Sequence, residues 1–183
     1  MATADHFFDF VYRTLERGLD RHADHPTLAP TYNPSLLARA SNIASDISYL
    51  LQTPENLWMA HPIHVELKAT FPPALKAYVE RLEHLLNSDD PSRLLAHAYV
   101  RYLGDLSGGQ VIRRRVAKAY GLDLGEDEGS GLGTKFYDFK QLGGSKSGNM
   151  GDFKKIKDWY REGMNQGAGD DVSKKSKCCL VKI

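Results

Sequence analysis

The stretch Tyr99–Gln110, YVRYLGDLSGGQ, decides how the rest of the chain is interpreted. It lies inside a long helical pattern and contains Gly104, Gly108 and Gly109. Each glycine inside a helix costs about 1 kcal/mol relative to alanine unless another contact offsets the loss. Glycine also removes the Cβ atom, which lets the helix bend and lets another object approach its backbone. Since Gly104 and Gly108 share one face, we expect something flat or bulky to lie there.

Two interpretations of this face are open. The first is close packing of a second helix on a surface of small residues spaced by four. The second is a ligand held against the bend of the helix. Ser107, Gly108 and Gly109 are consecutive, whereas helix packing needs small residues on one face only. On spacing alone the packing interpretation is the more common case, and the consecutive small residues weaken it.

The composition is that of an ordinary globular domain. The chain has 183 residues, 42% of them hydrophobic, which is enough for one domain with a real core. A net charge of +1 gives no argument for binding nucleic acid or a membrane surface. The adjacent Cys178 and Cys179 cannot build a disulfide framework, which fits a reducing compartment. Neither a signal peptide nor an apolar run of about 18 residues is visible, so we expect a cytoplasmic protein without a transmembrane anchor.

Helical periodicity dominates the sequence and strand patterns are almost absent. We expect a first helix that begins by Phe7 and ends near Gly18–His22, a second over Pro34–Leu51, a third over Phe71–Asn87, a fourth from Asp90 to Tyr120, and a last one from Asp152. Asn33 and Asp90 are the expected caps of the second and fourth helices, and Gly121 ends the fourth. The loops expected after it are Asp123–Gly133 and Gly143–Gly151. The sequence predicts an all-α bundle over residues 1–165 and a flexible tail over 166–183.

A family resemblance adds to this pattern. YLGDLSGGQ, with Tyr99 and Arg101 just before it, closely resembles the distal-helix signature of the heme oxygenases. LAPTYNP resembles a connector of that family, ALKAYVERL resembles its next helix, and FKKIKDWYREGMN resembles its later helix at the heme edge. The resemblance extends from about Phe10 to Asn165 and implies a heme oxygenase-like helical bundle with a glycine-kinked long helix.

The resemblance also implies an activity. A heme oxygenase binds heme as both substrate and cofactor, uses dioxygen and reductase-supplied electrons, and cleaves the ring to biliverdin, carbon monoxide and ferrous iron. The implied partners are heme, dioxygen and an NADPH-dependent electron-donor reductase. The alternative function is that of a non-catalytic heme-binding or helical interaction protein.

The resemblance assigns roles around the glycines. Gly104 and Gly108 would form the floor over which the oxygen bends, and Asp105 would order the waters that deliver protons. Arg101, Tyr12 and Tyr78 would be the other anchors of that network. From the residues alone, Asp105 is either a solvated carboxylate or, since leucines flank it at a bend, one that points into a site. Tyr12 and Tyr78 could equally be core tyrosines with satisfied hydroxyls.

The heme edge has its own implied residues. Lys157 and Arg161 lie four apart on the last helix and would bind the two propionates, with Arg161 able to make a bidentate contact. Tyr99 would line the heme edge, and Gly109 would contribute to the same cofactor site. The alternative for the two cations is a solvated face, because Lys154, Lys155 and Asp158 nearby are also charged.

The axial iron ligand is where the sequence departs from the family. The family takes it from a histidine on a helix that precedes the one carrying Tyr12, and the closing helices that follow Asn165 in the family also have no match. His6 does not match the ligand position, and His97 matches a family histidine that is not the axial ligand, so a packed and hydrogen-bonded role is expected for it. The histidine pairs His22/His25 and His61/His64 lack the acidic partners of a zinc site. We therefore expect no protein metal site and weak or absent catalysis.

Overall fold

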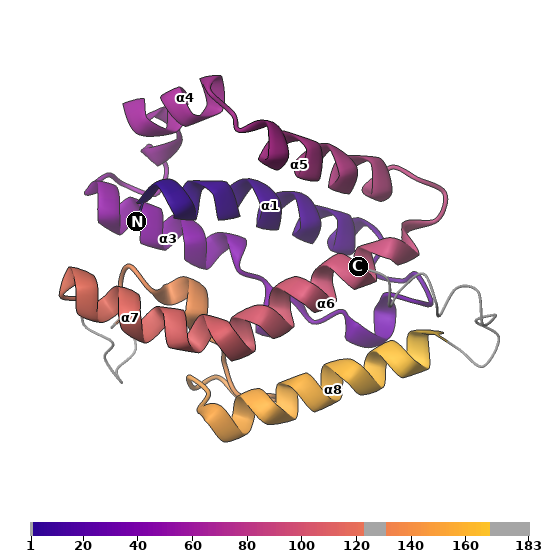
Figure 1. Cartoon of the computed structure of the whole chain (residues 1–183). Helices are drawn as coiled ribbons and strands as arrows, with labels where there is room; N and C mark the ends of the chain where they lie inside the picture. The colour runs from indigo at the N-terminus through magenta and orange to yellow at the C-terminus, as the bar shows by residue number, and fades with distance from the viewer. Residues whose placement is uncertain (1, 123–130, 169–183) are drawn as a thin grey trace.

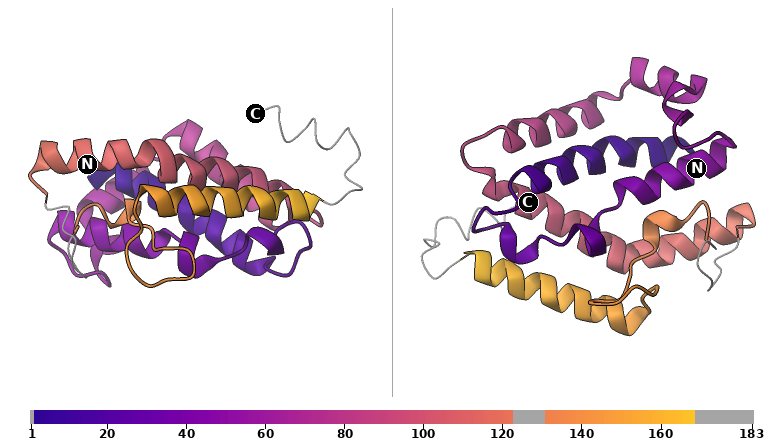
Figure 2. Two further views of the ribbon diagram at one scale, coloured as in Figure 1. Left: turned by 90° about the horizontal axis from the view of Figure 1, so that it is seen from below. Right: turned by 180° about the vertical axis from the view of Figure 1, so that it is seen from behind.

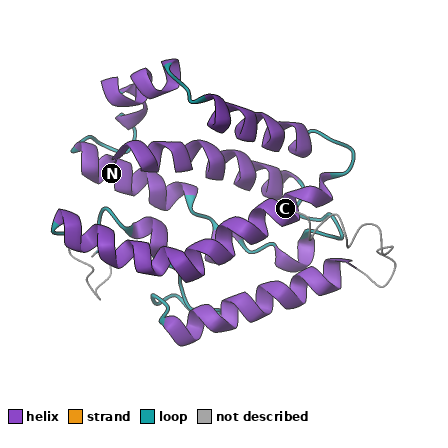
Figure 3. Ribbon diagram, viewed as in Figure 1, coloured by secondary structure: helices purple, strands orange, loops and turns teal. Residues whose placement is uncertain are grey.

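The structure, a computed structural model, describes residues 2–122 and 131–168. These ranges are mostly helical (Figure 3), and the extended pairing within them is a single antiparallel bridge between Lys140 and Ser147. The prediction of an all-α fold is confirmed. None of the helices described is both long enough and apolar enough to cross a membrane.

Eight α-helices and five short helical turns follow one another along the described ranges. The α-helices are α1 (Ala2–Arg21), α2 (Pro34–Leu37), α3 (Ala40–Leu51), α4 (Pro62–Ala69), α5 (Pro73–Leu86), α6 (Leu94–Gly104), α7 (Gln110–Tyr120) and α8 (Met150–Ala168). Four turns are 3-10 helices: η1 (Ala29–Thr31), η2 (Trp58–Ala60), η3 (Pro91–Arg93) and η5 (Lys135–Tyr137). The fifth, η4 (Asp105–Gly109), is π-helical and joins α6 directly to α7.

Helix α1 lies at the centre of the bundle (Figure 1). It packs against α3 on one side and α5 on the other, and α6 crosses it. Helix α8 lies along the outer side of α6 and contacts the connector that contains η1. The further views in Figure 2 show that the helices form a flattened assembly rather than a round one.

The core is built from the apolar faces of α1, α3, α5 and α6. Its fully buried side chains include Leu15, Ile47, Leu82 and Leu94. These residues recur at helical spacing in the sequence, so burying one stripe of each helix explains why the four helices associate. Together they hold the long helix α6–η4–α7 in a fixed position relative to α1.

The expected caps are present. The Asn33 Oδ1 accepts a hydrogen bond from the Leu36 N–H at 3.2 Å, and the Asp90 Oδ1 accepts one from the Ser92 N–H at 3.0 Å. Gly121 ends α7 with a φ of +63°, a left-handed conformation that favours glycine. These boundaries follow from local sequence chemistry, which is why they could be predicted.

The predicted second helix is wrong in one respect, because it is divided into α2 and α3. Ala38 adopts extended backbone angles between the two. The carboxylate of Glu16 accepts hydrogen bonds from the N–H groups of Arg39 and Ala40, and so provides the start of α3 with its acceptors. A contact from α1 therefore interrupts a helix that looks continuous in the sequence.

Other boundaries also differ from the prediction. Helix α4 lies between the second and third expected helices and was not predicted; Pro62 occupies its first turn, where proline is tolerated. The third and last helices begin at Pro73 and Met150, and the fourth opens with the 3-10 turn η3. Helix α8 extends to Ala168, into the segment expected to be a tail. Residues 123–130 of the first expected loop and 169–183 of the tail lie outside the described residues.

Candidate functional site

Gly104 and Gly108 lie on an uncovered part of the long helix. Nothing in the described part of the chain comes within 4 Å of the place where a Cβ atom at either glycine would be. Three apolar side chains of the same helix, Val100, Val111 and Ile112, are also half exposed. We refer to these five residues as the open face. A second helix does not pack on the two glycines, so the interpretation of a small-residue packing surface is not supported by the described residues.

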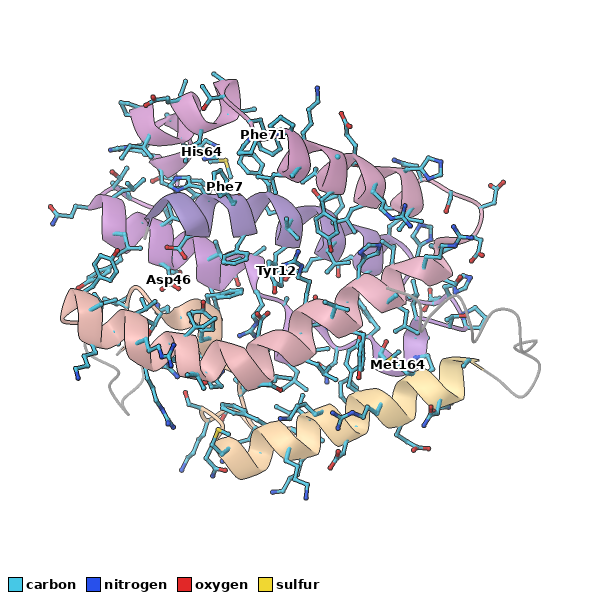
Figure 4. The ribbon with its side chains drawn as sticks, viewed as in Figure 1. Phe7, Tyr12, Asp46, His64, Phe71 and Met164 are labelled. Carbon is cyan, nitrogen blue, oxygen red and sulfur yellow. The ribbon has the colours of Figure 1, made fainter. Side chains whose placement is uncertain are left out.

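Asp105 and Tyr12 meet beneath the open face. The Tyr12 hydroxyl, on a side chain that is 1% exposed, donates a hydrogen bond to the Asp105 Oδ2. Figure 4 shows Tyr12 between α1 and α6. Burial raises the pKa of Asp105 to about 7, and the hydrogen bond from Tyr12 together with the charges of Arg39 and Arg101 limits the rise. Asp105 therefore points into the bundle and is not a solvated carboxylate.

Arg101 and Tyr78 form a second polar group on the same side of α6. The guanidinium carbon of Arg101 lies 5.0 Å from the centre of the Tyr78 ring. The Tyr78 hydroxyl is 3.1 Å from the His97 Nδ1, so His97 is hydrogen-bonded as predicted. The Arg101 Nε is buried and has no hydrogen-bond acceptor among the described residues. A buried donor without an acceptor is unusual in proteins.

A buried pair behind Asp105 was missed by the sequence reasoning. Arg39 is 3% exposed, and its guanidinium donates hydrogen bonds to the backbone carbonyls of Leu36, Leu37 and Asp138. Glu16 accepts the Arg39 N–H, and burial raises the pKa of Glu16 to about 7. Glu16 lies on α1 and Arg39 lies just before α3, 23 positions apart, and neither residue lies in a motif. The sequence carried no local signal for the pair.

The third glycine of the motif has a different environment. Gly109 is buried, and a Cβ atom there would lie 3.1 Å from the ring of Tyr137. Burial, with the nearby charge of Asp105, raises the pKa of Tyr137 to about 12. Gly109 thus faces the η5 segment, whereas Gly104 and Gly108 face outward. The structure brings only two of the three motif glycines to the open face.

The two expected propionate ligands are placed unequally. The Lys157 Nζ donates a hydrogen bond to the Ser107 Oγ at 3.3 Å, and Ser107 precedes Gly108 in the chain. Arg161, one turn further along α8, is exposed and pairs with Asp158 at 3.1 Å. The ring of Tyr99 faces α8, with its centre 6.3 Å from that of Tyr160. Lys157 thus contacts η4, whereas Arg161 pairs with a residue of α8 itself.

The histidines take part in other contacts. His6 is fully buried, with its ring centre 5.5 Å from Trp58 and 5.2 Å from His64. In Figure 4, His64 lies at α4, at the end of the bundle away from α8. His22 is hydrogen-bonded to the Leu86 carbonyl. Across residues 2–122 and 131–168, no group of three or more histidine, cysteine, aspartate or glutamate side chains is arranged to hold a metal ion.

Comparison with known proteins gives one consistent family. The family model for heme oxygenase matches residues 4–177. The chain is 38% identical over 156 residues to heme oxygenase 2 of Macaca fascicularis, covering 85% of this chain and 42% of that protein. It is 35% identical over 166 residues to heme oxygenase 1 of Gallus gallus, covering 91% of this chain and 48% of that protein. The chain thus spans about half the length of these curated relatives.

Solved structures agree in fold. A heme oxygenase-2 from Synechocystis sp. PCC 6803, solved in complex with heme and NO, matches with a TM-score of 0.72 and 28% identity over 98% of this chain and 63% of that chain. A heme oxygenase from Leptospira interrogans matches with a TM-score of 0.71 and 28% identity over 98% of this chain and 75% of that chain.

Proposed function

The chain belongs to the heme oxygenase family, and from this premise we propose that it binds heme on the open face and acts in oxidative heme degradation. The observation that supports the proposal best is the pair of uncovered glycines next to a partly buried carboxyl. Gly104 and Gly108 expose bare backbone, and Asp105 between them is held by Tyr12. A flat macrocycle needs such a surface, because any Cβ atom would keep it away from the polar group below.

The residues present fit heme chemically. Val100, Val111 and Ile112 offer half-exposed apolar side chains to the macrocycle. Lys157 contacts Ser107, which precedes Gly108 in the chain, and we propose that it binds one propionate. We propose that Arg161 binds the other after leaving Asp158, and that Tyr99 lines the same edge. The unpaired Arg101 Nε is a donor suited to water or another polar group over the ring.

The proposed reaction divides the work between heme and protein. Bound heme supplies the iron that activates dioxygen and the ring carbon that is oxidised. Asp105, with a pKa of about 7, can hold or release a proton at its Oδ atoms near neutral pH. The hydrogen bond from Tyr12 orients that carboxyl, and Arg101 and Tyr78 line the same side of α6. A carboxyl with so high a pKa is a weak acid, which suits a site that must deliver protons without providing a strong acid.

The finer features of the activity rest on the family. We propose biliverdin, carbon monoxide and ferrous iron as products, with heme acting as both substrate and cofactor. We propose dioxygen and an NADPH-dependent reductase as the other participants. The residues described here do not assign an axial iron ligand, since His6 and His64 pack on each other and His97 bonds to Tyr78. That observation favours a second candidate function, heme binding without turnover.

One titration separates these functions. Hemin added to the chain is expected to give a saturable shift of the Soret band, and Gly104→Leu is expected to weaken binding while the circular dichroism stays helical. The bound sample is then supplied with reductase, NADPH and dioxygen, with and without free imidazole as a substitute ligand. Biliverdin in either condition supports the enzyme, and binding without biliverdin supports the second candidate. Absence of any saturable Soret shift would refute both.

A further inference from the structure

The π-helical turn η4 needs something to hold it. A π-helical turn contains one more residue than an α-helical turn and occurs mostly as a single bulge within an α-helix. The angle per residue in an α-helix is about 100°, so losing the extra residue would rotate α6 relative to α7 by about that amount. Asp105 begins η4 and Gly109 ends it. The direction in which Asp105 leaves the helix therefore depends on whether the turn stays π-helical.

Gln110, the first residue of α7, connects the start of this turn to a neighbouring segment. Its side chain is among the buried polar groups, at 7% exposure. The Nε2 donates one hydrogen bond to the Asp105 carbonyl at 3.1 Å and a second to the Tyr137 carbonyl at 2.9 Å. Both donors of one carboxamide are thus used on two backbone acceptors, one inside η4 and one in η5.

The segment at the other end of this bridge is itself fixed. The carboxylate of Asp46, on α3, accepts hydrogen bonds from the N–H groups of Lys135 and Phe136 at 2.9 and 2.8 Å. Figure 4 shows Asp46 on the side of α3 that faces this segment. The Tyr137 ring also presses on the bare backbone of Gly109, where a Cβ atom would lie 3.1 Å away. Gln110 therefore ties η4 to a segment that α3 holds in place.

We infer that Gln110 is a positioning residue, and that its bridge between the Asp105 and Tyr137 carbonyls keeps η4 π-helical and the Asp105 carboxyl directed at Tyr12. The same bridge keeps Gly104 and Gly108 turned outward while Gly109 is turned inward. The role of Asp105 in heme chemistry rests on the proposed function, whereas the bridge and its effect on the Tyr12–Asp105 pair do not. A glutamine is suited to this position because it has two donors and no charge.

The test measures the coupling between Tyr12 and Asp105 in the heme-free chain. The pKa of Asp105 is followed by carboxyl NMR or infrared titration, before and after Tyr12→Phe, in three backgrounds: wild type, Gln110→Met and Gln110→Glu. In the wild type, losing a hydrogen bond to a carboxylate is expected to change the proton affinity of Asp105 by about tenfold or more. In both Gln110 variants, Tyr12→Phe is expected to change the proton affinity of Asp105 by less than about twofold, because the carboxyl no longer forms a hydrogen bond with Tyr12.

Two variants and a control make the result decisive. Gln110→Met removes both donors without adding charge, and Gln110→Glu keeps the shape while placing a carboxylate against two carbonyls. Gln166→Glu, on an exposed residue of α8, is the matched control and should retain the full coupling. Circular dichroism and urea unfolding select the variants that are folded, and coupling undiminished in a folded variant overturns the inference. A hemin titration run in parallel tests the proposed function separately, since loss of coupling in a chain that never binds hemin still supports the role of Gln110.

Discussion

The Tyr12 hydroxyl donates a hydrogen bond to the Asp105 carboxylate across 93 positions of sequence. Burial raises the pKa of Asp105 to about 7, and this hydrogen bond opposes the rise because it stabilises the charged form. A contact between α1, which carries Tyr12, and η4, which begins with Asp105, therefore affects the protonation of this carboxyl near neutral pH. The position of this pair below Gly104 and Gly108 is what links the fold to the proposed chemistry.

Tyr12→Phe is expected to raise the pKa of Asp105 further. The variant keeps the buried ring and its contacts with Phe136 and Tyr102, and removes only the donor. A hydrogen bond to a charged group contributes about 1.5–3 kcal/mol, which corresponds to a rise of about 1–2 pKa units. A pH titration of the Asp105 carboxyl by infrared spectroscopy measures the shift. An unchanged or lower pKa would show that the hydrogen bond does not control this group.

Asp105→Asn is expected to stabilise the heme-free chain at alkaline pH. The folded pKa of about 7 lies above the ordinary value of 3.8, so from pH 4 to 7 the folded chain holds a proton that the unfolded chain has lost. The free energy of unfolding therefore falls as the pH rises through this window, and the full penalty is present above pH 7. Asparagine carries no charge and can still accept from Tyr12, so the gain at pH 8 is at most about 4 kcal/mol. Urea unfolding at pH 4.5 and pH 8, with the exposed Asp24→Asn as control, should show a much larger gain for Asp105→Asn at pH 8 than at pH 4.5.

The glycines of the motif should respond in opposite ways to alanine. At Gly104 a Cβ atom meets open space, so Gly104→Ala is expected to stabilise the heme-free chain by about 0.5–1 kcal/mol through helix propensity. The same methyl group stands on the open face and is expected to weaken hemin binding. At Gly109 the Cβ atom would lie 3.1 Å from the Tyr137 ring, so Gly109→Ala is expected to destabilise the chain. Thermal unfolding and hemin titration of both variants check the contrast, which equal losses of stability would contradict.

Much of the fold could be predicted from local sequence, and the contradictions share one physical cause. Asn33, Asp90 and Gly121 mark helix ends through their own backbone chemistry, so these boundaries agreed with the structure. The break before α3 depends on Glu16, which is far away in sequence. The glycines indicated a weakened helix, but its π-helical form involves Gln110 and Tyr137 across 27 positions. Contacts between distant segments decide these features, and a single sequence does not display them.

In the site, too, some features follow from local sequence and others depend on contacts between distant segments. The leucines near Asp105 indicated that its side chain could point into a site, and the family resemblance placed Asp105 and Tyr12 in the same polar network. The difference between Gly109 and the other two glycines could not be predicted, because it depends on the ring of Tyr137. The unequal placement of Lys157 and Arg161 likewise depends on Ser107 and Asp158.

Lys157 is expected to contribute to hemin affinity more than its neighbours on α8. Lys157→Gln removes the cation that lies beside Ser107 and is expected to weaken hemin binding by a few fold, with a weaker dependence on salt. Lys154→Gln, on an exposed residue of the same helix, is the matched control and should have little effect. Soret titrations at low and high sodium chloride measure both variants. Equal effects of the two substitutions would indicate a general electrostatic attraction instead of a specific contact.

His64 is expected to make the α4 end of the bundle sensitive to acid. His64 is 7% exposed and its ring stacks on Phe10, and its pKa is lowered by burial and by the charges of His6, Lys68 and Arg13. A lowered pKa means that the unfolded chain takes up a proton first as the pH falls below about 6.5, so this contribution to stability is present above that pH and lost below it.

His64→Phe keeps an aromatic ring against Trp58, 4.9 Å away in the wild type, and cannot be protonated. Urea unfolding followed by Trp58 fluorescence in a Trp159→Phe background should show less destabilisation by His64→Phe at pH 5.5 than at pH 7.5. His84→Gln, at an exposed residue of α5, serves as the control. An effect of His64→Phe that is the same at both pH values would refute the prediction.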